Sequence, residues 1–152
     1  MENVNYFCGV DVSKETLDVA FMSNQEICLE ERIANNEKII TQFFQKALKL
    51  LGISSNEFLI CLEHTGIYGY TLLKVAQKRS FKICSESPIQ MKRSQGMVRG
   101  KNDKIDARRI AEYAQKNALK LKLWQPRRKP IEQLKALLVV RERLVKVKKQ
   151  NF

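Results

Sequence analysis

The sequence stretch that decides the fold is YFCGVDV, at residues 6–12. It is a short, continuous apolar run with Asp11 near its end, and such runs are typical of central strands that are covered on both faces. A second run of this kind, FLICL at residues 58–62, is followed directly by Glu63. Burying an unpaired carboxylate is costly. Two central strands that each end at an acid therefore predict a cationic group that gathers these acids.

The segment between these two runs predicts an antiparallel meander and a helix. Residues 16–22 and 27–33 alternate apolar and polar side chains with the period of a strand. Asn35 or Asn36 is expected to cap a helix, because apolar residues then recur at three- and four-residue spacing. Gly52 is expected to end this helix.

The remainder of the first 125 residues alternates helices with one more strand. A helix is expected from about Tyr68 to Arg79, and residues 81–84 form a short fifth strand. Residues 87–101 lose clear periodicity and predict a loop, after which a helix resumes around Ile105. The order strand-strand-strand-helix-strand-helix-strand-helix predicts an α/β fold of the ribonuclease H-like kind, a mixed five-stranded sheet with helices on its faces.

A basic C-terminal segment follows this predicted sheet domain. Residues 1–125 are expected to form one domain, and residues 126–152 a linker and the start of a basic coiled-coil helix. Because the helical pattern continues to the last residues, we expect the chain to be a fragment of a longer protein. Apolar residues, with two basic ones among them, recur at the spacing of the a and d positions of a coiled coil: Ile131, Leu134, Leu138, Arg141, Val145 and Lys148.

Charge is distributed unevenly along the chain. Residues 1–81 contain 8 Lys and Arg against 10 Asp and Glu, a net −2, whereas residues 82–152 contain 20 against 6, a net +14; together they give the overall +12. A local excess of this size predicts nucleic-acid binding through phosphate groups. A membrane-binding face would need bulky apolar anchors beside its lysines, and the sequence has no such amphipathic helix.

The sequence also predicts the compartment. No apolar run is long enough to cross a bilayer, and the N-terminus lacks the pattern of a signal peptide, so we expect a soluble, cytoplasmic protein with no membrane partner. The cysteines Cys8, Cys28, Cys61 and Cys84 are widely spaced and form no CxxC pair. They are expected to be reduced, buried, small apolar residues.

A further acidic pair joins the two strand-end acids. Asp103 and Asp106 lie three residues apart and are expected to share one face of the first turn of their helix. Asp11 and Glu63 are expected to meet where neighbouring parallel strands end. Hard carboxylate oxygens select Mg²⁺ or Mn²⁺, and such ions support in-line phosphoryl transfer. The sequence therefore predicts a metal site formed by Asp11, Glu63, Asp103 and Asp106.

Each acid also has a structural interpretation. Asp103 is a competent helix cap, and Asp106 would favour the helix dipole. Asp11 could start a turn between two strands, and Glu63 could pair with a neighbouring side chain. The single histidine, His64, fits a residue that orients Glu63 or contacts substrate, and it equally fits a structural role.

Basic residues surround the third acidic element and continue into the linker. A phosphodiester substrate requires such cations beside a metal site. Tyr68 and Tyr70 could approach a sugar or phosphate, or could simply pack on a helix face. The residues expected to bind nucleic acid are Lys92, Arg93, Arg99, Lys101, Lys104, Arg108, Arg109, Arg127, Arg128 and Lys129.

Three motifs carry a family resemblance: GVDVSK at residues 9–14, LEHTGIYG at residues 62–69 and KNDKIDARRIAEYA at residues 101–114. In order, spacing and flanking residues they resemble the motifs of the DEDD-type insertion-sequence transposases, the group related to the Piv DNA invertase. The resemblance covers roughly residues 5–125. It places the four acids of the family's motif on Asp11, Glu63, Asp103 and Asp106.

The resemblance implies a RuvC-like domain that binds divalent metal and helps to cut and rejoin DNA. It also implies a separate C-terminal domain with a serine nucleophile, which we expect to lie outside this chain. Some members of the group are guided by a structured bridge RNA, and the basic helix would match the coiled coil that connects the domains and helps them to form homo-oligomers.

Two other functions stay open at this stage. The first is an autonomous, structure-selective DNA endonuclease in which the same acids activate water. The second is a non-catalytic module that binds nucleic acid and dimerises, and whose acids cap helices and pair with arginines.

Overall fold

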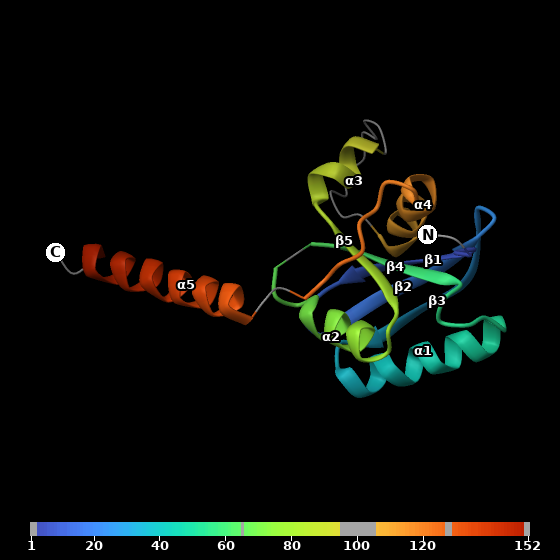
Figure 1. Ribbon diagram of the computed structural model, residues 1–152, viewed down its shortest axis with the longest axis horizontal. Helices are drawn as coiled ribbons and strands as arrows, with labels where there is room; N and C mark the ends of the chain where they lie inside the picture. The colour runs from blue at the N-terminus through green and yellow to red at the C-terminus, as the bar shows by residue number, and fades with distance from the viewer. Residues whose placement is uncertain (1–2, 65, 95–105, 127–128, 151–152) are drawn as a thin grey trace.

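The computed structural model describes residues 3–64, 66–94, 106–126 and 129–150. Within these ranges the strands form one mixed five-stranded sheet in the order β3-β2-β1-β4-β5 (Figure 1). β1 (Tyr6–Val12) pairs antiparallel with β2 (Thr16–Ser23), which pairs antiparallel with β3 (Glu26–Ala34). On its other side β1 pairs in parallel with β4 (Phe58–Glu63), which pairs in parallel with β5 (Lys82–Glu86). The predicted α/β fold with a mixed sheet is confirmed.

Helices cover both faces of this sheet. α1 (Glu37–Leu51) and α2 (Tyr70–Lys78) lie on one face, and α3 (Pro88–Ser94) and α4 (Ala107–Asn117) lie on the side opposite α1 (Figure 1). α3 falls in the segment that was predicted to be a loop, and that prediction is wrong for residues 88–94. α3 has only 7 residues and buries one apolar side chain, Met91. A single buried residue gives no apolar periodicity from which a helix could be predicted.

The ends of α1 follow the expected capping chemistry. Asn36 is the N-cap, and its side-chain oxygen accepts a hydrogen bond from the backbone N–H of Ile39 at 2.9 Å. Gly52 ends the helix with a φ of 66°, a left-handed conformation that glycine adopts without the strain of a Cβ atom.

The two faces of the sheet have separate cores. Toward α1 the core is aromatic and includes Phe21, Phe44 and Phe58. Toward α4 it includes Cys61 of β4 and Ile110 of α4. Because side chains alternate along a strand, each strand contributes to both cores, which explains why β1 and β4 read as continuous apolar runs.

α4 lies directly on β1 at Gly9. A Cβ atom at residue 9 would stand 2.0 Å from the carbonyl oxygen of Ala107 and 2.3 Å from the backbone nitrogen of Ala111. Both distances are far inside van der Waals contact, so only glycine permits this approach. The close contact sets the position of the first turn of α4, two residues along β1 from Asp11.

The prediction that all four cysteines are buried is wrong for Cys28. Cys8, Cys61 and Cys84 are buried and Cys28 is exposed, and all are free thiols. Cys28 lies on β3, an edge strand whose side chains are mostly exposed, so an apolar segment alone does not predict burial there. Burial raises the pKa of the Cys8 thiol well above its ordinary value.

α5 (Lys129–Gln150) is a helix that extends away from the sheet and its covering helices (Figure 1). Its apolar side chains are exposed, including Leu134, Leu138 and Val145. No helix within the described ranges is both long enough and apolar enough to span a membrane.

Candidate metal and nucleic-acid site

Three carboxylates lie at the ends of three parallel strands. β1, β4 and β5 run in the same direction and carry Asp11, Glu63 and Glu86 near their carboxyl ends. Val10 is opposite Leu62 and Glu63 is opposite Glu86, so the acids follow one row across the strands. Strand alternation places them on the α4 side, because Phe7, Cys61 and Cys84, two or four residues earlier, belong to the core beneath α4.

Asp11 and Glu63 interact electrostatically. The pKa of Glu63 is raised, first because the half-buried carboxyl is poorly solvated and second because the negative charge of Asp11 is close. Lys92 acts in the opposite direction and lowers this pKa. The structure therefore brings together the first two predicted acids, with one of the predicted basic residues near them.

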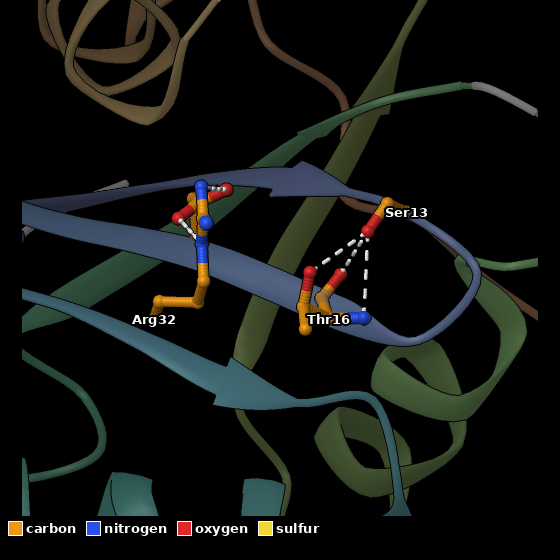
Figure 2. A network of polar contacts seen from close by, with 4 residues as sticks. Ser13, Thr16 and Arg32 are labelled. Carbon is orange, nitrogen blue, oxygen red and sulfur yellow. Dashed lines mark hydrogen bonds and ion pairs between the residues drawn. The ribbon is translucent and has the colours of Figure 1, made fainter.

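A fourth carboxylate in this row, Asp18, is held by an arginine. Asp18 is opposite Asp11 in the β1–β2 pairing. Arg32 of β3 donates to its two carboxylate oxygens from Nε and Nη2 at 2.7 and 3.1 Å (Figure 2). This bidentate pair neutralises Asp18. Asp11 lies between Asp18 and the strand that carries Glu63, because β1 lies between β2 and β4.

The turn after Asp11 is stabilised by hydrogen bonds of the Ser13 and Thr16 hydroxyl groups. Ser13 Oγ donates to the carbonyl oxygen of Thr16 and lies within 2.9 Å of Thr16 Oγ1 (Figure 2). Asn35 then ties this turn to the loop after β4: its side-chain amide donates to the carbonyl oxygens of Ser13 and Tyr68, each at 3.0 Å. The segments that follow Asp11 and Glu63 are thus held together by one amide, so the spacing between the two strand ends is built into the fold.

Asp106 occupies a different helix position from the one predicted. It was expected within the first turn, but it is the N-cap of α4, with an extended backbone and a side chain that accepts from the N–H of Arg109 at 2.9 Å. Since α4 begins at Ala107 on top of Gly9, this cap lies near the carboxyl end of β1. Asp103, the fourth predicted acid, lies outside the described residues.

The cap predicts how Asp106 variants change stability. Asp106→Ala should lower the free energy of unfolding by about 1 kcal/mol, because the Arg109 N–H loses its acceptor. Asp106→Asn should change it by no more than a few tenths of a kcal/mol, since asparagine caps as well as aspartate. Urea denaturation of both variants checks this. Equal destabilisation by the two would show that the charge of Asp106, rather than its cap hydrogen bond, stabilises α4.

Glu86 is a residue of the carboxylate row that the sequence analysis missed. The pKa of its carboxyl is raised by burial, while a hydrogen bond with Tyr113 of α4 acts in the opposite direction. Burial, followed by the charge of Glu86, raises the pKa of Tyr113 to about 12, so the phenol donates this hydrogen bond at neutral pH. The sequence does contain the pattern that could have identified Glu86, because KICSE at residues 82–86 ends in an acid as FLICLE at residues 58–63 does. The predicted strand, however, ended at Cys84.

The donor set suits a hard divalent cation, although the described residues alone do not complete a site. Across residues 3–64, 66–94, 106–126 and 129–150, no group of three or more His, Cys, Asp and Glu side chains is close enough to hold one metal ion. Asp11 and Glu63 do supply carboxylate oxygens, and their mutual repulsion is of the kind that a bound cation relieves.

The predicted basic residues fall into four groups. Lys92 and Arg93 are exposed on α3, beside the carboxylate row. Arg108 makes a bidentate ion pair with Glu30 of β3, with Nε and Nη2 at 2.7 and 2.6 Å from the carboxylate, so phosphate would have to compete with Glu30 for it. Arg109 is exposed on α4 and Lys129 begins α5. The others lie outside the described residues: Arg99, Lys101, Lys104, Arg127 and Arg128.

His64 and Tyr68 lie at the surface of the loop after β4, and Tyr70 is the first residue of α2. His64 Nδ1 is 3.4 Å from Ser85 Oγ, and its backbone N–H donates to the carbonyl oxygen of Glu86 at 2.8 Å. Tyr68 and Tyr70 are both exposed. All three side chains are accessible from solvent near the carboxyl end of β4.

Sequence comparison identifies one family. Residues 8–151 match the DEDD transposase family of the IS110 type, whose description is "Transposase". No curated protein matches the sequence.

Structural comparison identifies solved structures with the same fold. They include the RuvC protein of Thermus thermophilus in complex with a Holliday junction substrate, with a TM-score of 0.55 and 12% identity, and a second RuvC structure from the same organism, with a TM-score of 0.54 and 13% identity. In each comparison 78% of this chain and 99% of the other chain are covered. At this identity the similarity shows the fold, which is the RuvC-like, ribonuclease H-like fold.

Proposed function

Because the chain belongs to the DEDD transposase family of the IS110 type, we propose that residues 1–125 are the metal-binding catalytic domain of a DNA transposase, and that this domain acts with a serine nucleophile from a separate C-terminal domain. The observation that carries the proposal is the placement of Asp11 and Glu63 on the same side of neighbouring parallel strand ends, where the charge of Asp11 contributes to the raised pKa of Glu63. Asp106 at the start of α4 and Asp103, just before it in the chain, would complete the four acids.

These acids would hold Mg²⁺ or Mn²⁺ against the scissile phosphate. The ion would neutralise charge on the nonbridging oxygens and lower the pKa of the attacking or leaving hydroxyl. The chain's own contribution is positioning: the Asn35 amide joins the loops after Asp11 and Glu63, and Gly9 lets α4 bring Asp106 to the same edge.

The serine of the other domain would attack phosphorus. Its oxygen forms an ester bond to the phosphate as the bond from phosphorus to the leaving strand end breaks, and the proton of the serine hydroxyl passes to a base or to solvent. The ester bond keeps the energy that rejoining requires. On this proposal, the described chain supplies the metal-binding part of a composite site and cleaves DNA very weakly by itself.

The substrate and partners follow from charge and from the exposed helix. Lys92, Arg93 and Arg109 would contact phosphate groups of DNA, and a structured guide RNA could use the basic residues from 127 onward. Residues 126–152 would form the linker and the start of a coiled coil, through which copies of the protein associate. The exposed apolar side chains of α5 support that association. We also propose the cytoplasmic location that the sequence analysis predicted.

Thermal unfolding with and without Mn²⁺ tests the metal site. A ligand that binds only the folded state stabilises it by about 2.7 kcal/mol at a hundredfold excess over its Kd. We expect this metal-induced increment in the parent chain, and expect it to be lost in Asp11→Asn and Glu63→Gln. Asp106→Asn, which keeps the helix cap, should also lose most of it.

A remote acid provides the control for this experiment. Glu112→Gln changes an exposed α4 carboxylate that pairs with Lys116, so its increment should equal that of the parent. An increment that all the variants retain would contradict the shared site. A parent chain that shows no increment in the presence or absence of DNA would favour a non-catalytic binding module. Strong Mg²⁺-dependent cleavage of branched DNA by this chain alone would favour an autonomous endonuclease.

A further inference from the structure

The carboxylate row continues past the proposed metal ligands onto β2. Asp18 of β2 lies directly opposite Asp11 in the β1–β2 pairing. Opposite residues of an antiparallel pair project from the same face of the sheet, with their Cβ atoms about 4.5–5.5 Å apart. Asp18 therefore lies on the α4 side, as Asp11 does, and a carboxylate at this position is within reach of an ion that Asp11 would hold.

Arg32 engages both carboxylate oxygens of Asp18. It lies opposite Asp18 in the β2–β3 pairing, and its Nε and Nη2 donate to Oδ1 and Oδ2 at 2.7 and 3.1 Å (Figure 2). These oxygens are the atoms with which Asp18 would coordinate a cation. The guanidinium group and a metal ion are therefore competing partners of the same carboxylate.

Arg32 is also within electrostatic range of Asp11. The pKa of Arg32 is raised, first by its hydrogen bond with Asp18, and the negative charge of Asp11 contributes to the same shift. The Arg32 side chain is 69% exposed and that of Asp18 33%, so replacing either one leaves no cavity in the core. The pair can therefore be opened by substitution while the sheet beneath it stays intact.

We propose that Arg32 is a specificity-determining residue of the metal site, because it withholds Asp18 from the ion that Asp11 and Glu63 hold. The inference rests on the proposed function, which assigns the ion to these two acids. Mg²⁺ requires nearly octahedral geometry, keeps several waters and takes one or two carboxylates, whereas Ca²⁺ accepts more oxygens and binds more tightly as carboxylates are added. By holding Asp18, Arg32 keeps the site selective for the smaller ion.

Thermal unfolding of Arg32→Met, titrated with Mg²⁺ and with Ca²⁺ in parallel, tests this role. The dependence of unfolding on ion concentration gives an apparent Kd for each ion. We expect the Kd for Ca²⁺ to fall by about tenfold, the size of effect typical of residues that orient metal ligands, and the Kd for Mg²⁺ to change by less than about threefold. The two ions carry the same charge, so loss of the Arg32 cation alone would tighten both equally.

Three further variants separate the released carboxylate from other effects. Arg32→Met/Asp18→Ala removes that carboxylate and should return the ratio of the two Kd values to that of the parent. Arg32→Lys keeps the charge without the paired donors and should give an intermediate ratio. Lys46→Met also removes one cation that pairs with a β3 carboxylate, Glu31, but on the side of α1, and should leave both Kd values within about twofold of the parent.

The outcomes distinguish this inference from the proposed function. If the parent binds Mg²⁺ but Arg32→Met leaves the ratio unchanged, or tightens both ions equally, the metal site stands and the role of Arg32 is wrong. A shifted ratio that persists in Arg32→Met/Asp18→Ala would likewise overturn the inference, because Asp18 would not be the added ligand. A parent chain that binds neither ion would contradict the metal site itself, and the role of Arg32 with it.

Discussion

Gly9→Ala is expected to lower the free energy of unfolding by about 3 kcal/mol and to abolish the Mn²⁺ increment. The new Cβ atom would lie 2.0 and 2.3 Å from backbone atoms of Ala107 and Ala111. Because the obstacles are backbone atoms, no side chain of α4 can rotate away, and the helix must move as a body. That movement would carry Asp106 away from the strand end that bears Asp11. Urea denaturation and thermal unfolding with Mn²⁺ measure the two effects.

Gly69→Ala is the matched control for this substitution. A Cβ atom at residue 69 would meet only the Cδ1 atom of Leu62, at 2.9 Å, and the end of a leucine side chain can move. The φ of Gly69 is −73°, which alanine adopts without strain. We expect its free energy of unfolding to change by no more than about 1 kcal/mol. A Gly9→Ala variant as stable as Gly69→Ala would contradict the close packing of α4 on β1.

The sequence predicted the part of the candidate site in which an acid directly ends a recognisable strand. The apolar runs before Asp11 and Glu63 are long enough to identify both strands, and parallel pairing then brings their ends together. Glu86 was missed because β5 is short and its last residues, Ser85 and Glu86, are polar, so periodicity ended the predicted strand two residues early.

The remaining features depend on tertiary contacts that a single sequence does not contain. Gly9 interrupts an otherwise good strand, and the reason is a helix that lies far along the chain, from Ala107 onward. Asn35 was expected to be one of two possible caps for α1. It instead joins the loops after β1 and β4, which no local pattern indicates. Nothing in the sequence pattern singles out Tyr113, and only the structure shows its phenol at Glu86.

The second large effect is expected on the opposite face of the sheet. Phe44 of α1 is fully buried, and its ring lies 5.4 to 6.1 Å from the ring centroids of its aromatic neighbours, Phe21, Phe43, Phe58 and Phe81. Phe44→Ala should lower the free energy of unfolding by about 3–5 kcal/mol, because it removes these ring contacts and leaves a cavity in the core. Urea denaturation measures the loss. Leu50→Ala, an exposed apolar residue of the same helix, should change stability by no more than about 0.5 kcal/mol.

The Mn²⁺ increment of Phe44 variants then separates stability from the site. α1 and the carboxylate row lie on opposite sides of the sheet. A folded Phe44 variant should therefore be stabilised by Mn²⁺ as much as the parent is, although both of its unfolding temperatures are lower. If Phe44→Ala does not fold, Phe44→Leu keeps most of the apolar volume and allows the same comparison. Loss of the increment in Gly9→Ala and its retention in the Phe44 variant would assign the metal site to the α4 face. Loss in both would mean that the spacing of Asp11 and Glu63 depends on the whole core, and the assignment of site geometry to Gly9 and Asn35 would be wrong.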